Sequence, residues 1–151
     1  MQNPEIITKL ALDPTLYVES MLKVEPDKWQ KKVLDSLLTD DKISIKSGHG
    51  TGKTALLSWV ILWWLSCRLP CKIAVTANTS NQLSDILWSE ISKWHRNLPQ
   101  GFKDLFEFKS DKINLVGVKG TSIIVNKKAT DTINGGHAEV KGTGIAAAGD
   151  A

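Results

Sequence analysis

The first forty residues have apolar side chains at helical spacing. In residues 1–25 the leucine, valine and methionine positions recur every three or four residues, and the pattern is interrupted at Pro14. Asp13 followed by Pro14 is typical of a helix start, because aspartate caps the first turn and proline needs no hydrogen bond there. A second apolar stripe, over residues 29–38, follows Pro26 and Asp27. The pattern predicts a helical lead-in over residues 1–40.

The next segments alternate between strand and helix patterns. Ile43 and Ile45 alternate with polar residues, as in a short strand. Residues 55–67 are almost continuously apolar, and 13 residues are too few to span a bilayer as a helix. A buried helix is therefore expected, followed by a parallel strand in the β-branched run 72–77.

The second half predicts one more long helix and then short strands. Residues 82–97 have apolar positions spaced to face a sheet, including Ile86 and Trp94. Short apolar runs then predict strands, as a β insertion or an edge meander, at 106–108, 113–116 and 122–125. Residues 129–151 are rich in glycine and alanine, with a weak strand pattern from Ile145. Strands alternating with helices predict an α/β fold.

Composition narrows the class of protein without identifying it. With 151 residues, 42% hydrophobic and 23% charged, the chain is long enough for one globular domain with a core. A net charge of +3 permits a polyanionic partner without requiring one. Cys67 and Cys71 have no further ligands in metal-site register, so we expect reduced, buried thiols rather than zinc. The N-terminal start is polar and unlike a secretory signal. This difference favours a cytoplasmic location.

Between the Ile43 strand and the apolar helix lies the motif Ser-Gly-His-Gly-Thr-Gly-Lys-Thr, residues 47–54. A strand, a glycine-rich loop ending in Gly-Lys-Thr and a helix form a phosphate-binding loop, or P-loop. Glycines let backbone N–H groups converge on a phosphate, and the helix N-terminus adds partial positive charge. The motif departs from the consensus only in Ser47, which occupies the first glycine position.

The residues of this loop are assigned by motif position. Lys53 would contact the β and γ phosphates and Thr54 would ligate Mg²⁺. The proposed nucleotide-binding set is Gln30, Ser47, Gly48, His49, Gly50, Thr51, Gly52, Lys53 and Thr54. A glycine-rich turn that caps a helix by chance would explain the glycines but not the Lys-Thr pair.

Two members of the site lie outside the loop. A glutamine amide donates and accepts at once, so Gln30 could recognise an adenine edge; the alternative is an exposed helical glutamine. Asp150, after the weak strand, is the candidate second Mg²⁺ ligand. Lys53 and Asp150 are the candidate catalytic residues. The alternative for Asp150 is an exposed aspartate, since no glutamate follows it.

The motif at residues 47–54, with the Trp-rich run 59–65, resembles the ATPase half of tailed-phage terminase large subunits. The resemblance continues through Ile73-Ala-Val-Thr-Ala-Asn-Thr79 and the segment 87–95. Upstream, Asp27-Lys-Trp-Gln30 is similar to the adenine-contacting segment of that family. The resemblance covers residues 25–98. Many terminase loops have an arginine within the stretch that is Ser47-Gly-His-Gly-Thr in this chain. His49 is a possible substitute for that arginine in contacting phosphate.

The resemblance implies an ASCE-type P-loop NTPase fold, with a parallel sheet flanked by helices and incomplete at the C-terminus. Together with the patterns above, this divides residues 1–151 into the helical lead-in (1–40), a P-loop core (42–98), a β-rich segment (102–128) and the Gly/Ala-rich end (129–151). The resemblance implies ATP and Mg²⁺ as cofactors. Double-stranded DNA, a portal or small terminase subunit and a homo-oligomeric ring are the implied partners, with no membrane.

The family also predicts features that this chain does not match. A family acidic strand ends in Asp-Glu, whereas here Gly149 and Ala151 flank Asp150. The nuclease domain of the family has no room in 151 residues, so the chain resembles an N-terminal fragment or a truncated copy. Three functions stay open: the ATP-binding part of a DNA-packaging motor, a helicase-like ATPase, or a non-hydrolysing relative that acts through protein interaction.

Overall fold

The computed structural model describes residues 4–46, 52–67, 72–76, 86–104, 106–108, 112–115, 122–126 and 144–148. Its helices are α1 (Pro4–Leu12), α2 (Pro14–Met21), α3 (Lys28–Ser36), α4 (Lys53–Cys67), α5 (Trp88–His95) and α6 (Gln100–Lys103). Its strands are β1 (Lys42–Lys46), β2 (Lys72–Thr76), β3 (Phe106–Phe108), β4 (Lys112–Leu115), β5 (Ser122–Asn126) and β6 (Gly144–Ala148).

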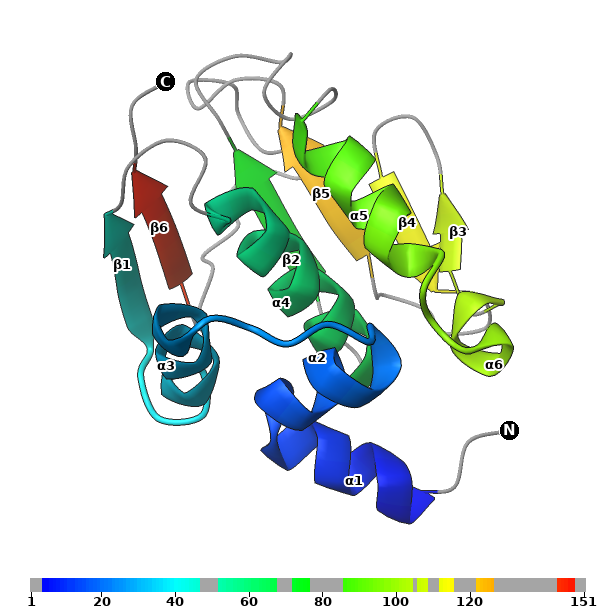
Figure 1. Ribbon diagram of the computed structural model, residues 1–151. Coiled ribbons are helices and arrows are strands. Elements are labelled where there is room, and N and C mark those ends of the chain that lie inside the picture. The colour runs from blue at the N-terminus through cyan, green and yellow to red at the C-terminus, as the bar shows by residue number, and fades with distance from the viewer. Residues whose placement is uncertain are drawn as a thin grey trace.

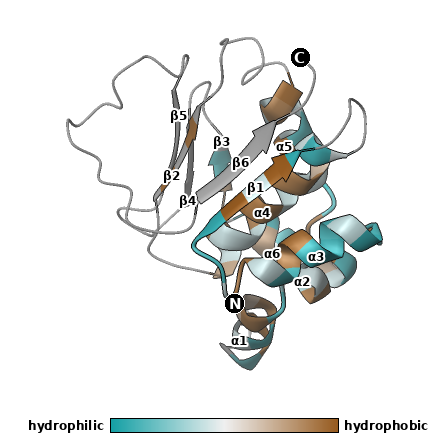
Figure 2. Ribbon diagram, turned by 90° about the vertical axis from the view of Figure 1, so that its left-hand side faces the viewer, coloured by the Kyte–Doolittle hydropathy of each residue, from teal (hydrophilic) through white to brown (hydrophobic). Residues whose placement is uncertain are grey.

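The strands form two hydrogen-bonded sheets. β1 pairs in parallel with β6, and β2 pairs in parallel with β5. The second sheet has the order β2-β5-β4-β3, and its β3–β4 and β4–β5 pairs are antiparallel. The described helices lie on one side of the strands, with α4 in front of β2 and α5 in front of β5 in Figure 1; Figure 2 shows the same arrangement from the β1 side.

The lead-in follows the predicted capping pattern. The Asp13 carboxylate accepts a hydrogen bond from the Leu16 N–H at 3.0 Å and caps α2, whose first residue is Pro14. This separates α1 from α2 where the apolar pattern is interrupted. The break turns Tyr17 inward, and its side chain is fully buried.

The central helix α4 is largely buried. Most of its apolar residues from Leu56 to Leu65 lie in the core, Leu57 and Trp64 are partly buried against it, and α4 packs against α1, α2 and α5. The buried-helix prediction for residues 55–67 is therefore confirmed. No helix in the described segments is long and apolar enough to cross a lipid bilayer.

Polar atoms inside this core have partners from the lead-in. The Trp63 indole N–H donates to the Leu10 carbonyl at 2.8 Å, and the Tyr17 and Ser66 hydroxyls are 2.9 Å apart. Burial raises the pKa of the Tyr17 phenol far above its ordinary value, so the group stays protonated. These bonds fix α1 and α2 against α4.

Several predictions for individual residues differ from the structure. Leu38 is 40% exposed because α3 ends at Ser36, before the predicted stripe is complete. Ile86 is 52% exposed, and the core positions beside it are Leu87 and Ile91. Between the predicted helix 82–97 and the first predicted strand of the second half, the chain forms the short helix α6, which the sequence analysis did not predict.

The other element predictions agree where residues are described. Strands are present in all the predicted runs, the segment from β3 to β5 is an antiparallel meander, and the weak strand pattern near the end forms β6. The Cys67 side chain is only partly buried, so the buried-thiol prediction is wrong for it. Cys71 and the N-terminal part of the 82–97 helix lie outside the described residues.

We expect Tyr17→Phe to lower the free energy of unfolding by about 1–3 kcal/mol, because it leaves the Ser66 hydroxyl buried without its partner. Adding Ser66→Ala should recover part of that loss, since both polar groups are then absent. Urea unfolding of the two single variants and the double variant measures the coupling. Strict additivity of the three values would contradict this assignment.

His95 should make stability depend on pH. Burial, with a smaller contribution from the Lys103 charge, lowers the pKa of His95 below its ordinary value of 6.5, and a hydrogen bond to the Lys103 carbonyl only partly opposes this. As pH falls below 6.5, the unfolded chain takes up the proton first, so stability is lost. Above pH 6.5 the stabilisation is fully present.

The measurement is urea unfolding at several pH values, for wild type and for His95→Gln. We expect a smaller loss of stability between about pH 6.5 and pH 5 in the variant, since glutamine can still donate to the Lys103 carbonyl but does not titrate. Identical pH profiles for the two proteins would show that His95 does not titrate differently on folding.

Candidate phosphate-binding site

The candidate loop is framed by the end of β1 and the start of α4. β1 ends at Lys46, and α4 begins at Lys53, so Lys53 and Thr54 are its first two residues. Both are half-buried. The first turn of α4 contains no acidic residue, so its helix dipole and Lys53 give this end a positive potential. Residues 47–51 lie outside the described part of the chain.

Gly52 closes the loop in a conformation that other residues avoid. Its φ is +98°, and its carbonyl accepts the first hydrogen bond of α4, from the Leu56 N–H at 3.0 Å. A Cβ at this position would lie 2.8 Å from the Gln30 Nε2 atom. The backbone conformation therefore requires glycine here, and a Cβ would also push the Gln30 amide aside.

Gln30 reaches this glycine from α3. Its Nε2 donates to the Gly52 carbonyl at 3.1 Å, and its Oε1 accepts from the Asp27 N–H at 2.8 Å. The side chain is only 5% exposed. The alternative of an exposed helical glutamine is thus excluded, and each end of the amide has one partner within the protein.

The sequence pattern gave only part of this contact. The spacing from Asp27 to Gln30 is that of a capping box, which explains the bond to the Asp27 N–H. The bond from Gln30 to Gly52 joins residues 22 positions apart and has no local signal. The Trp29 ring was also missed as a neighbour of the loop; its Cζ2 would lie 4.0 Å from a Cβ at Gly52.

The candidate acidic residue, Asp150, follows β6 in sequence. In the β1–β6 pair, Lys46 lies opposite Ala148. Because the strands are parallel, the chain leaves both at the same end of the pair, toward the loop from β1 and toward Asp150 from β6. Asp150 itself, with Gly149 and Ala151, lies outside the described residues, so its distance from Thr54 stays open.

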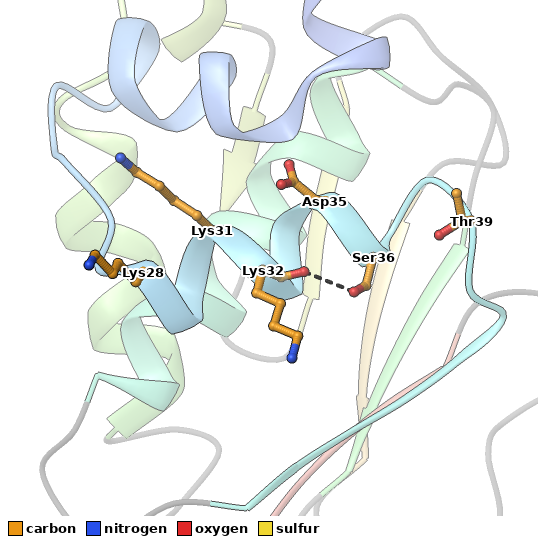
Figure 3. A pocket seen from close by; sticks show the side chains of 6 residues that line it. All are labelled: Lys28, Lys31, Lys32, Asp35, Ser36 and Thr39. Atoms are coloured by element: carbon orange, nitrogen blue, oxygen red, sulfur yellow. Dashed lines mark hydrogen bonds between the residues drawn. The ribbon is translucent and has the colours of Figure 1, made fainter.

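Other charged surfaces do not make a second phosphate site. An open hollow on α3 is lined by Lys28, Lys31, Lys32, Asp35, Ser36 and Thr39. Its lysine side chains point in different directions (Figure 3), and the Lys31 Nζ lies 3.6 Å from Glu19 and 3.7 Å from Glu25. Within the described segments, no three His, Cys, Asp or Glu side chains group as metal ligands.

Several aromatic and basic residues of α5 already contact other residues of the protein. The Lys93 Nζ lies 5.0 Å from the centroid of the Trp94 ring, and His95 hydrogen-bonds the Lys103 carbonyl at 3.2 Å. Trp88 packs on the core, and Arg96 is exposed. In the sequence, Trp88, Lys93, His95 and Arg96 predict contact with nucleic acid, with cations that complement the helix C-terminus as the alternative, and both stay predictions.

Comparison with family models, curated protein sequences and solved structures gave no match. The assignment of the site therefore depends on its own motif and geometry.

We expect Gly52→Ala to lower the free energy of unfolding by about 1–3 kcal/mol, because alanine would be held at an unfavourable positive φ. It would also displace the Gln30 amide. Gly101→Ala, at an exposed position of helix α6, is the matched control and should not destabilise. Thermal and urea unfolding measure both. Equal stability of Gly52→Ala and wild type would exclude the strained conformation.

Proposed function

We propose that the chain binds Mg-ATP through residues 47–54. Lys53 contacts the β and γ phosphates, and the Thr54 hydroxyl ligates Mg²⁺. The observation that carries the proposal is the junction at Gly52. A glycine at positive φ leads directly into a 15-residue helix whose first residues are Lys53 and Thr54.

The physics of this junction suits a polyphosphate. The first N–H groups of a helix have no partner within the helix, so they are available to an anion. The charge of Lys53 adds to the helix dipole at the same end. The parallel β1–β6 pair supports Asp150 as a second metal ligand, because it directs that segment toward the loop end of β1.

For the intact protein, we propose Mg-ATP hydrolysis coupled to translocation of double-stranded DNA, as in a viral DNA-packaging motor. The support is the resemblance of residues 25–98 to terminase large subunits. Portal or small-subunit partners and a ring of subunits belong to the same proposal, and the cytoplasm of a host cell is the proposed compartment. A helicase-like ATPase would use the same loop chemistry.

Binding without hydrolysis is the second candidate. Hydrolysis needs an acid that holds Mg²⁺ and usually another that orients the attacking water. Gly149 and Ala151 flank Asp150. One acid is therefore missing whether Asp150 takes the aspartate or the glutamate position of the family's Asp-Glu pair. A chain of this kind would act by joining a motor ring as an interaction protein.

We expect wild type to bind Mg-ATP and Lys53→Ala to bind it at least tenfold more weakly, since a charge-assisted hydrogen bond contributes about 1.5–3 kcal/mol. Isothermal titration calorimetry measures the affinities. Lys42→Ala is the control: it removes the same charge from the other end of β1, where the side chain is exposed. No binding of Mg-ATP by wild type would overturn the proposal.

A phosphate-release assay on the same proteins separates the two candidates. Turnover that is present in wild type and abolished in Lys53→Ala would support an ATPase and exclude the binding-only alternative. Tight binding with no turnover would favour the interaction protein.

A further inference from the structure

The Gln30 side chain joins two structural elements through one amide. Its oxygen accepts from the Asp27 N–H, at the start of α3, and its nitrogen donates to the Gly52 carbonyl, at the start of α4. The bond to Gly52 is called the Gln30–Gly52 contact below. At 5% exposure the amide is shielded from water, so the contact competes little with solvent.

The Gly52 carbonyl is held by two donors. It accepts from the Leu56 N–H at 3.0 Å and from the Gln30 Nε2 at 3.1 Å, which uses both lone pairs of the oxygen. Because a peptide unit is planar and trans, its C=O and N–H point in opposite directions. Fixing the Gly52 carbonyl therefore fixes the direction of the Lys53 N–H.

The Lys53 N–H is one of the groups that a bound phosphate would need. It belongs to the first residue of α4, at the helix end where backbone N–H groups bind anions. A glycine at this junction has more backbone freedom than other residues, so its peptide units would turn more easily without a second restraint. The Gln30–Gly52 contact supplies that restraint.

We infer that Gln30 is a positioning residue for phosphate binding, acting through Gly52 on the Lys53 amide, and not primarily a reader of the base. This rests on the proposed function of the loop. Bidentate recognition of adenine uses one donor and one acceptor of a glutamine amide together. Here each atom of that pair already has a protein partner.

The test compares ligands with and without a base. Titration calorimetry with Mg-ATP, Mg-GTP and inorganic tripolyphosphate is applied to wild type and Gln30→Met, which keeps the side-chain length and removes both hydrogen bonds. We expect all three affinities to fall by the same factor, about three- to tenfold, with the ratio of ATP to GTP affinity unchanged. A base reader would instead lose affinity for ATP and keep that for tripolyphosphate.

Amide hydrogen exchange gives a readout that needs no ligand. The Leu56 N–H donates to the Gly52 carbonyl, so release of that carbonyl should speed exchange at Leu56 in Gln30→Met. Ser36→Ala is the control, because it removes a side-chain bond to the Lys32 carbonyl elsewhere in α3. It should change neither exchange at Leu56 nor any of the three affinities.

The outcomes separate this inference from the proposed function. If wild type binds tripolyphosphate and Gln30→Met loses only ATP affinity, the positioning role is wrong and the proposed function stands. Unchanged affinities and unchanged exchange at Leu56 would also refute the positioning role. If wild type binds neither ATP nor tripolyphosphate, the proposed function fails and the positioning role for a ligand fails with it.

Discussion

Helix α4 is apolar around its whole circumference, so every face of it needs a partner. The helices α1, α2 and α5 supply partners on one side, and the strands lie on the other. A helix of this kind is unstable alone in water and is held by tertiary packing. Hydrogen bonds from Trp63 to Leu10 and between Tyr17 and Ser66 satisfy polar groups inside that packing. Among the residues that the structure describes, the buried indole N–H of Trp59 has no partner.

The same burial fixes the position of the helix N-terminus. Because the body of α4 is held from several directions, Lys53 and Thr54 emerge from a rigid support, and Gly52 turns the chain into it. Gln30 connects this point to α3, which lies before the motif in sequence. The proposed phosphate site is therefore supported from outside the loop as well as from within it.

Local signals predicted most elements and few of the contacts between them. The cap at Asp13, the alternation at Ile43 and Ile45 and the apolar run of α4 are encoded within a few residues, and the structure follows them. Leu38 and Ile86 were misassigned because helical spacing does not show where a helix ends or which side a partner covers. The Gln30–Gly52 contact spans 22 residues, so no window of local sequence contains it. The assignment to the P-loop NTPase class and the roles assigned to residues 47–51 and 149–151 remain predictions.

The pairing of β1 with β6 has a consequence for the order of folding. Lys42 lies opposite Gly144, so the strand before the candidate loop pairs with a segment that is far from it in sequence. Closing so long a loop is slow, because chain entropy is lost before the contact forms. The helices of the lead-in have local contacts and can pack on α4 earlier. On a ribosome the β1–β6 pair could therefore form only after β6 has been synthesised, later than the helical core beside it.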